Sequence, residues 1–291
     1  MVEAYHASVR TRSTHLDYRW LNGEPAQWWL YSDWGSSLLR LSEATLLIQD
    51  QESSEGRGVY LGGIQSSRRD SVQSRIRYDI SFTPCSTDEL SLTPAELARL
   101  LAAWWNQRGT GSNAPWELGQ QIDAALATEA EIPAESALDA IVGAQALTDP
   151  QLKAVLDVMR SAGASLAASG AIGADLSEAA WIGAGNTAVP TLISAAISND
   201  SWKRPIAYFA QIRASDLSPQ RTDDALPRHA LLIVDGESGL APKAPVRAPD
   251  TPNPPRQTRL DPRLRVVLIG STTVLVAIAV VLILRRMRTG E

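Results

Sequence analysis

The 291-residue chain has one cysteine, Cys85, and three histidines, at positions 6, 15 and 229. A single cysteine excludes an internal disulfide and argues against a cysteine-based metal site. The histidines form no HExxH pattern and do not cluster with acidic residues at a metal-ligand spacing. The sequence therefore predicts neither a metal site nor a bound cofactor.

Motifs that bind phosphate or present a catalytic nucleophile are also missing. The chain has no GxxxxGK[ST] loop and no GxSxG elbow, and the glycines at 170–173 and 183–185 do not match GxGxxG. Close packing of glycine and alanine explains those two segments better. We expect a binding protein with no catalytic residues, and we keep an enzyme as the alternative.

Lysine is scarce and the acidic residues are unevenly distributed. Lysine occurs only at positions 153, 203 and 243, which with the many arginines and alanines indicates a GC-rich bacterial genome. Residues 1–235 carry a net charge near −10 and residues 236–291 one near +5. An acidic main part argues against nucleic acid as a partner. A basic end suits an anionic membrane surface.

Long apolar segments are absent except for one near the C-terminus. Residues 266–284 form a 19-residue segment without a charged side chain. As a helix it would be about 28 Å long, enough to cross the hydrocarbon core of a bilayer, which we expect to be its partner. Small residues at 270–273 would allow close helix contact and a homo-oligomer. The flanking basic residues are Arg263, Arg265, Arg285, Arg286 and Arg288.

The expected orientation follows from the N-terminus. Residues 1–20 lack the apolar stretch of a secretory signal. We therefore expect a single-pass tail anchor in the inner (plasma) membrane, with the main body in the cytoplasm and a short basic tail, 285–291, across the bilayer. The arginines on the two sides of the span are too similar in number to decide the orientation by themselves.

A linker is expected between the body and the span. Residues 236–265 contain seven prolines and few large apolar side chains. This composition cannot form a core and favours extended polyproline II segments, which could hold the body up to about 80 Å from the bilayer. We interpret the segment as a spacer, and a proline-rich recognition motif is the alternative.

The body, residues 1–235, begins with strand patterns over 1–92. Segments at 3–9, 14–20, 28–32, 45–49 and 58–64 are short and rich in β-branched or aromatic residues. Residues 75–82 give the clearest pattern, because Ile76, Tyr78, Ile80 and Phe82 alternate with polar residues. One face of this strand should be buried and the other exposed to water.

Helical patterns follow over 93–182. Residues 93–96 form a capping box, with proline at the first helical position. Further amphipathic helices are expected from near positions 115, 133 and 149. Residues 183–235 are mixed, with late strands at 205–213 and 229–235 that have only the early strands to pair with. We expect one α+β fold with an antiparallel N-terminal part; the alternative is a β domain followed by a separate helical domain.

The candidate contact site lies in the β-rich part. A turn is expected at 62–74, where two glycines precede serines and arginines that could bind a phosphate or a carboxylate. The alternative is a solvated hairpin in which Arg68 or Arg69 pairs with Asp70 or Asp79. The residues assigned to contact a ligand or partner are Arg57, Ser66, Ser67, Arg68, Arg69, Arg75 and Arg77.

Three functions agree with this organisation. The first is a membrane-anchored interaction, adaptor or regulatory module that recruits a protein partner to the inner membrane. The second is an anchored enzyme or sensor that binds an anionic small molecule at the arginine-rich turn. The third is an effector that oligomerises in the membrane. The identity of the partner does not follow from the sequence.

Overall fold

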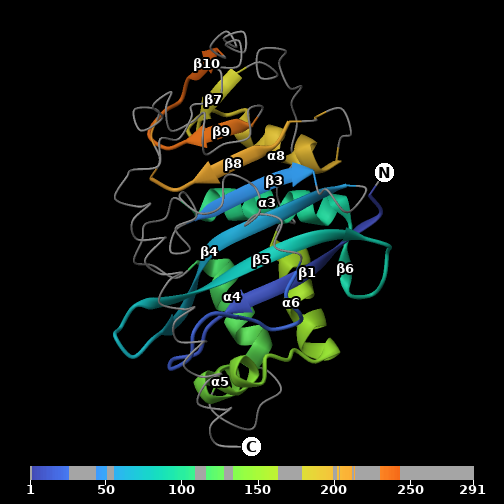
Figure 1. The fold of residues 1–291 in the computed structure, drawn as a ribbon, viewed down its shortest axis with the longest axis vertical. Coiled ribbons are helices and arrows are strands. Elements are labelled where there is room, and N and C mark those ends of the chain that lie inside the picture. Colours follow the sequence, from blue (N-terminus) through green and yellow to red (C-terminus); the bar gives the residue numbers. More distant parts are fainter. Residues whose placement is uncertain are drawn as a thin grey trace, which may run out of the picture. The chain divides into compact units, whose positions relative to one another are not determined.

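The structure is a computed structural model, and its described residues form one mixed sheet with helices on one face (Figure 1). It describes residues 2–25, 44–50, 56–108, 116–127, 134–162, 179–198, 202, 204–211, 213 and 230–242. All of these belong to one unit, Met1–Ala244. The sheet has ten strands in the order β10-β7-β9-β8-β3-β4-β5-β1-β2, with β6 beside β1. The expected α+β class is confirmed.

The N-terminal strands form the antiparallel part of the sheet. It contains β1 (Ala4–Thr11), β3 (Thr45–Asp50), β4 (Arg57–Arg69) and β5 (Arg75–Cys85). Short strands β2 (Arg19–Trp20) and β6 (Ser91–Leu92) pair with β1. The strand expected at 14–20 was too long, because the Ser13 hydroxyl accepts the amides of residues 15 and 16 and holds a bend. The strand expected at 28–32 lies outside the described residues.

The late strands extend the same sheet, as the lack of other pairing partners predicted. Strand β8 (Ile206–Phe209) pairs antiparallel with β3. Strand β9 (Leu231–Val234) runs parallel to β8 and to β7 (Ala179–Gly183). Strand β10 (Leu240–Pro242) adds antiparallel to β7. The parallel pairing was not predicted, and β10 places part of the expected linker in the sheet.

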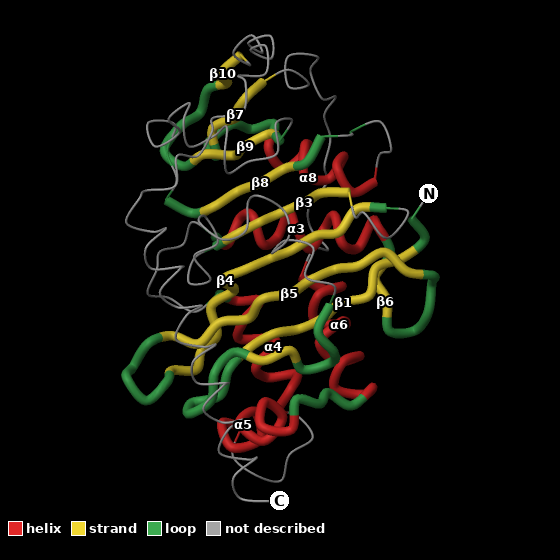
Figure 2. The backbone as a smooth tube through the Cα atoms, viewed as in Figure 1, coloured by secondary structure: helices red, strands yellow, loops and turns green. Residues whose placement is uncertain are grey.

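The described helices lie on one side of the sheet (Figure 2). They are α3 (Pro94–Gln107), α4 (Glu117–Ala127), α5 (Ala134–Ala144), α6 (Asp149–Ala162) and α8 (Val189–Ser198). The first four were predicted. The capping box of α3 is confirmed, because the Thr93 hydroxyl accepts the Glu96 amide and the Glu96 carboxylate accepts the Thr93 amide.

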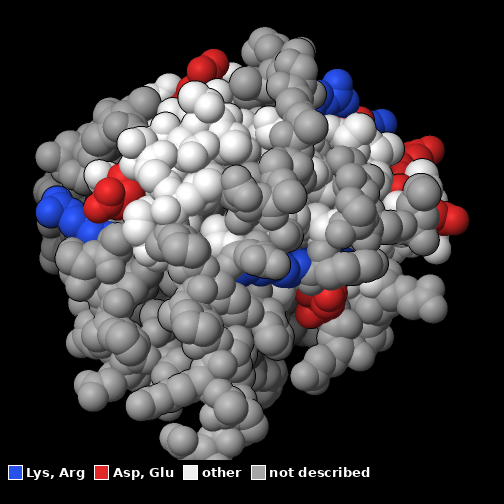
Figure 3. Space-filling model, turned by 90° about the horizontal axis from the view of Figure 1, so that it is seen from above, with Lys and Arg blue, Asp and Glu red and all other residues white. Residues whose placement is uncertain are grey.

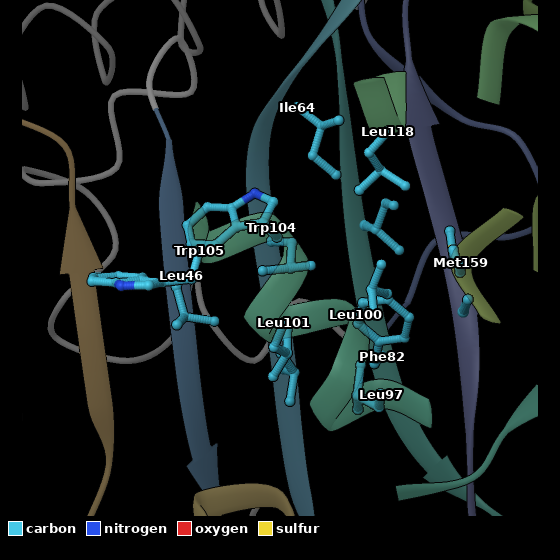
Figure 4. Packing of buried hydrophobic residues seen from close by; sticks show 14 of the residues in the cluster. Leu46, Ile64, Phe82, Leu97, Leu100, Leu101, Trp104, Trp105, Leu118 and Met159 are labelled. Carbon is cyan, nitrogen blue, oxygen red and sulfur yellow. The ribbon is translucent and has the colours of Figure 1, made fainter. Parts of the chain in front are cut away.

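The main core lies between these helices and the first face of the sheet. In Figure 4, side chains of α3 point towards the strands, and Leu118 and Met159 add from α4 and α6. The Trp104 ring also meets Trp105, Trp116 and Tyr208 at centroid distances of 6.0–6.3 Å. Burying each large apolar side chain stabilises the fold by roughly 1.5–3 kcal/mol, so this layer fixes the sheet and helices together.

The second face of the sheet carries a smaller apolar cluster. It consists of alternate residues of the middle strands, and no described helix packs on it. In Figure 3, which looks from the β10 end, the described surface shows separate basic and acidic side chains and no broad patch of either sign. The members of the second cluster are Leu47, Tyr60, Ala207, Phe209, Leu232 and Val234.

The expected membrane anchor cannot be placed. In the part of the chain that the structure describes, no helix combines the length and apolar character that a bilayer span requires. The predicted span at 266–284, its flanking arginines and most of the predicted linker lie outside that part. The anchor therefore stays a prediction from the sequence.

Candidate functional site at the β4–β5 hairpin

Six of the seven predicted contact residues lie near the turn of the β4–β5 hairpin, and one lies apart from them. The strand β4 continues to Arg69, so the turn expected at 62–74 is restricted to residues 70–74. Arg57 begins β4 at the far end, where its Nε lies 3.1 Å from Asp50 Oδ1 and its Nη1 donates to the Ala196 carbonyl at 3.0 Å. Arg57 therefore belongs to a different surface.

Arg68 is a buried residue and does not belong to the exposed turn. Its side chain is directed towards α4, where Nε lies 3.2 Å from Asp123 Oδ1. Its two Nη atoms donate to the Arg12 carbonyl at 3.2 Å and to the Thr11 hydroxyl at 3.1 Å. The expected pairing of Arg68 with Asp70 or Asp79 is therefore wrong, because β4 turns this side chain to the helix-covered face.

The Asp123 carboxylate binds both predicted serines and one further residue. It accepts hydrogen bonds from the hydroxyl of Ser66 at 2.8 Å, from the amide and hydroxyl of Ser67 at 2.8 and 2.6 Å, and from the hydroxyl of Tyr78 at 2.8 Å. Burial and the charge of Asp123 raise the pKa of Tyr78, so the phenol stays protonated and donates. This network fastens α4 to both strands of the hairpin.

Glycine allows α4 to approach β4 this closely. A Cβ atom on Gly119 would lie 2.1 Å from the Gln65 carbonyl oxygen, a distance that a side chain cannot adopt. The same carbonyl accepts the Trp116 amide at 3.0 Å. The start of α4 therefore sits directly on the strand, and this contact places Asp123 within reach of Ser66 and Arg68.

The turn itself is held by Asp70. Its Oδ1 accepts the amides of Val72 at 3.0 Å and Ser74 at 2.7 Å, and its Oδ2 is paired with Arg12. The Asp70 amide also donates to the Ser74 carbonyl at 2.9 Å. These bonds fix the backbone while the Val72 side chain remains 76% exposed. In Figure 1 this tip extends beyond the neighbouring strand ends at the lower left.

Two arginines occupy opposite backbone positions just below the tip. Arg69 and Arg75 are directly opposite in the β4–β5 ladder. Arg69 Nη1 donates to the Gln73 carbonyl at 2.6 Å, and Arg75 Nη1 donates to the Ser66 carbonyl at 3.0 Å. Partial burial and the charge of Arg69 lower the pKa of the Arg75 guanidinium. The tip thus presents an exposed apolar residue beside two like charges.

Asp79 is a buried acidic residue that the alternation pattern had placed on the wet face. Gly62 and Gly63 form a bulge opposite it, with Gly63 at φ 74°, and the Gly63 amide donates to Asp79 Oδ1 at 3.0 Å. Arg10 Nη1 lies 3.6 Å from Oδ2. Burial raises the pKa of Asp79 to about 6, although Gly63, Arg10 and the Tyr60 hydroxyl lower it. The prediction that this face of β5 is exposed to water is therefore wrong at Asp79 and also at Ser81, because both residues are buried.

A second possible site lies at the carboxyl ends of the parallel strands, where open α/β sheets commonly bind ligands. There a Cβ atom on Gly183 would lie 2.2 Å from the Glu237 backbone, and the Gly185 amide donates to the Glu237 carbonyl at 2.9 Å. The glycines after β7 therefore accommodate another segment of this chain. This agrees with the packing interpretation of the 183–185 glycines.

Neither a metal centre nor a relative directs the assignment. Among the described residues, no group of three or more His, Cys, Asp or Glu side chains is arranged to hold a metal ion. Comparisons with protein-family models, with curated proteins and with solved structures give no match. The function must therefore be inferred from the hairpin. Sequence reasoning missed Asp123, which carries no local signal, and considered Asp79 only as a possible partner of Arg68 or Arg69.

Proposed function

We propose that this chain is a single-pass, C-terminally anchored protein of the inner membrane whose cytoplasmic body acts as an interaction module. The body would recruit a protein partner through the tip of the β4–β5 hairpin. The exposed Val72 on a turn fixed by Asp70 carries this proposal. A preorganised apolar contact loses little conformational freedom on binding. A tether near the membrane would raise the local concentration of both partners.

The same residues weigh against an anion-binding enzyme or sensor. The hydroxyls of Ser66 and Ser67 and the guanidinium of Arg68 are the groups that would have held a phosphate. All three are directed at Asp123. A small anion would have to displace a buried carboxylate to reach them, which favours recognition at the tip instead. We propose no reaction for this protein.

Site-specific crosslinking in the cell tests this function. A photo-crosslinking amino acid replaces Val72 in the full-length chain, and a matched variant carries it at the exposed Arg99 on α3. We expect a discrete protein adduct from position 72 only, in the membrane fraction. Ending the chain after residue 265 should move both the chain and its adduct to the soluble fraction. Position 72 giving no adduct beyond that of position 99 would contradict the proposal.

A further inference from the structure

The positions of Arg69 and Arg75 impose an electrostatic cost on the hairpin. Like charges directly opposite in an antiparallel ladder destabilise it, and here both belong to exposed or half-exposed side chains. Arg77 lies two residues further along β5 and adds a third positive charge on that strand. Folding by itself does not require this arrangement at a solvent-exposed tip, where polar residues of either charge would serve.

The acidic residues near the hairpin are already bound to other groups. Asp70 accepts two amides of the turn and pairs with Arg12. Asp123 lies on the helix-covered face of the hairpin, where it pairs with Arg68. Asp79 pairs with Arg10 and the Gly63 amide. Arg69 makes no ion pair with an acidic residue in the described part of the chain. Its charge is therefore not neutralised by the described fold.

We propose that the hairpin tip binds an acidic segment of a partner protein. One carboxylate of that segment would lie between Arg69 and Arg75, and an adjacent apolar side chain would cover Val72. Guanidinium groups bind carboxylates bidentately, and Arg69 and Arg75 are register partners across the hairpin, so one segment laid on the tip could meet both. This inference rests on the proposed function, because it names the partner chemistry of the same tip.

The charge of the whole body makes the tip selective for such a partner. Residues 1–235 carry a net charge near −10, so an acidic segment is repelled by most of the surface and attracted to this position. A lipid surface fits less well. Loops and helices that enter a membrane interface present several large apolar or aromatic residues, whereas Val72 is a single aliphatic side chain at this turn.

Charge reversal at Arg69 separates binding from folding. Arg69→Glu would place a carboxylate opposite Arg75, which replaces repulsion by attraction and should leave the melting temperature equal or higher. The probe is a fluorescent peptide of alternating glutamate and leucine, titrated against the full chain in neutral nanodiscs. We expect Arg69→Glu to weaken binding at least tenfold, Val72→Ser to weaken it several-fold, and added salt to weaken it in the unmodified chain.

Matched controls give each outcome a meaning. Arg99→Glu, on exposed α3 surface, should leave peptide affinity within twofold. A glutamine–leucine peptide should bind at least tenfold more weakly than the glutamate one. Equal affinity of Arg69→Glu and the unmodified chain for the glutamate peptide would overturn the inference, while an adduct at position 72 would still support the proposed function. Hydrogen-exchange protection of residues 70–74 by anionic nanodiscs, without peptide binding, would overturn it in favour of lipid.

Discussion

Asp123 and Asp79 are both buried, and they lie on opposite faces of the same hairpin. Asp123, on α4, accepts hydrogen bonds from two serines and a tyrosine and pairs with Arg68. Asp79, on β5, accepts the Gly63 amide, and its Oδ2 makes no hydrogen bond with a described residue. Its nearest cation, on Arg10, is 3.6 Å away.

The difference shows what burial of a charge requires. A buried carboxylate needs donors that replace its hydration, and Asp123 has them from both strands of the hairpin. Asp79 has fewer, so burial raises its pKa to about 6. We infer that the first face uses its acid to hold α4 in place, whereas the second face bears an ionised acid at a cost near neutral pH.

Removal of Asp123 should have the largest effect on stability. Asp123→Ala would leave Arg68, whose side chain is only 6% exposed, buried without its counter-charge. Breaking a buried pair in this way costs about 3–5 kcal/mol. Chemical denaturation followed by circular dichroism should show a matching fall in the free energy of unfolding. Glu117→Ala, on the exposed side of α4, should change it by a few tenths of a kcal/mol at most.

A double variant tests whether stability requires the Arg68–Asp123 ion pair itself or only the absence of an unpaired buried charge. Arg68→Met with Asp123→Leu removes both charges and keeps apolar volume at the site. Such replacements of buried pairs are often neutral or stabilising. The hydroxyls of Ser66, Ser67 and Tyr78 would lose an acceptor, so we expect the double variant to fall between Asp123→Ala and the unmodified chain. A double variant less stable than Asp123→Ala would contradict this explanation.

Local signals in the sequence predicted most of the elements. The capping box at Thr93 and Glu96 marked the start of α3, and alternation at 75–82 marked β5. The parallel strands were not recognised as parallel, because β8 and β9 are only four residues long and apolar throughout. A fully buried run of this length does not reveal its direction or its neighbours. The helix α8 was missed inside a mixed segment.

The site was harder to predict because its contacts are long-range. The residues of the Arg68–Asp123 pair are 55 positions apart in the sequence, and nothing at either position indicates the other. The glycine pair at 62–63 was assigned to a turn, whereas it forms a bulge within β4 that changes which side chains face the helices. Composition identified the arginines of the hairpin, but only the fold separates the buried Arg68 from the exposed Arg69.

The next prediction concerns Asp79 and pH. Its pKa is about 6 in the folded chain and ordinarily 3.8, so the folded state binds a proton more tightly than the unfolded state. The stability associated with the protonated acid is fully present below pH 3.8 and is lost as the pH rises through 6. Asp79→Asn mimics the protonated form. At pH 7.5 we expect it to be more stable than the unmodified chain, by at most about 3 kcal/mol.

The pH profile distinguishes the titration of Asp79 from a change in stability that is the same at every pH. Melting temperatures measured from pH 4 to pH 8 should be closest at the acidic end for Asp79→Asn and the unmodified chain, separate between pH 4 and pH 6, and stay apart by a constant amount above pH 6. Asp157→Asn on α6, where the carboxylate is well exposed, should give a profile parallel to that of the unmodified chain. Lower stability of Asp79→Asn at pH 7.5 would mean that the ionised acid is favourable, and that Arg10 and Gly63 satisfy it fully.

The smallest effect should come from Tyr78→Phe, which removes one donor from Asp123 and leaves the others in place. The loss of one hydrogen bond costs about 1 kcal/mol. The same substitution in an Asp123→Asn background should cost less, since the acceptor is then uncharged, and the difference gives the coupling between the two side chains. Equal costs in both backgrounds would show that the contribution of the Tyr78 hydroxyl does not depend on the charge at position 123. A measurable coupling would show that Asp123 is stabilised by several shared donors, of which Asp79 has fewer.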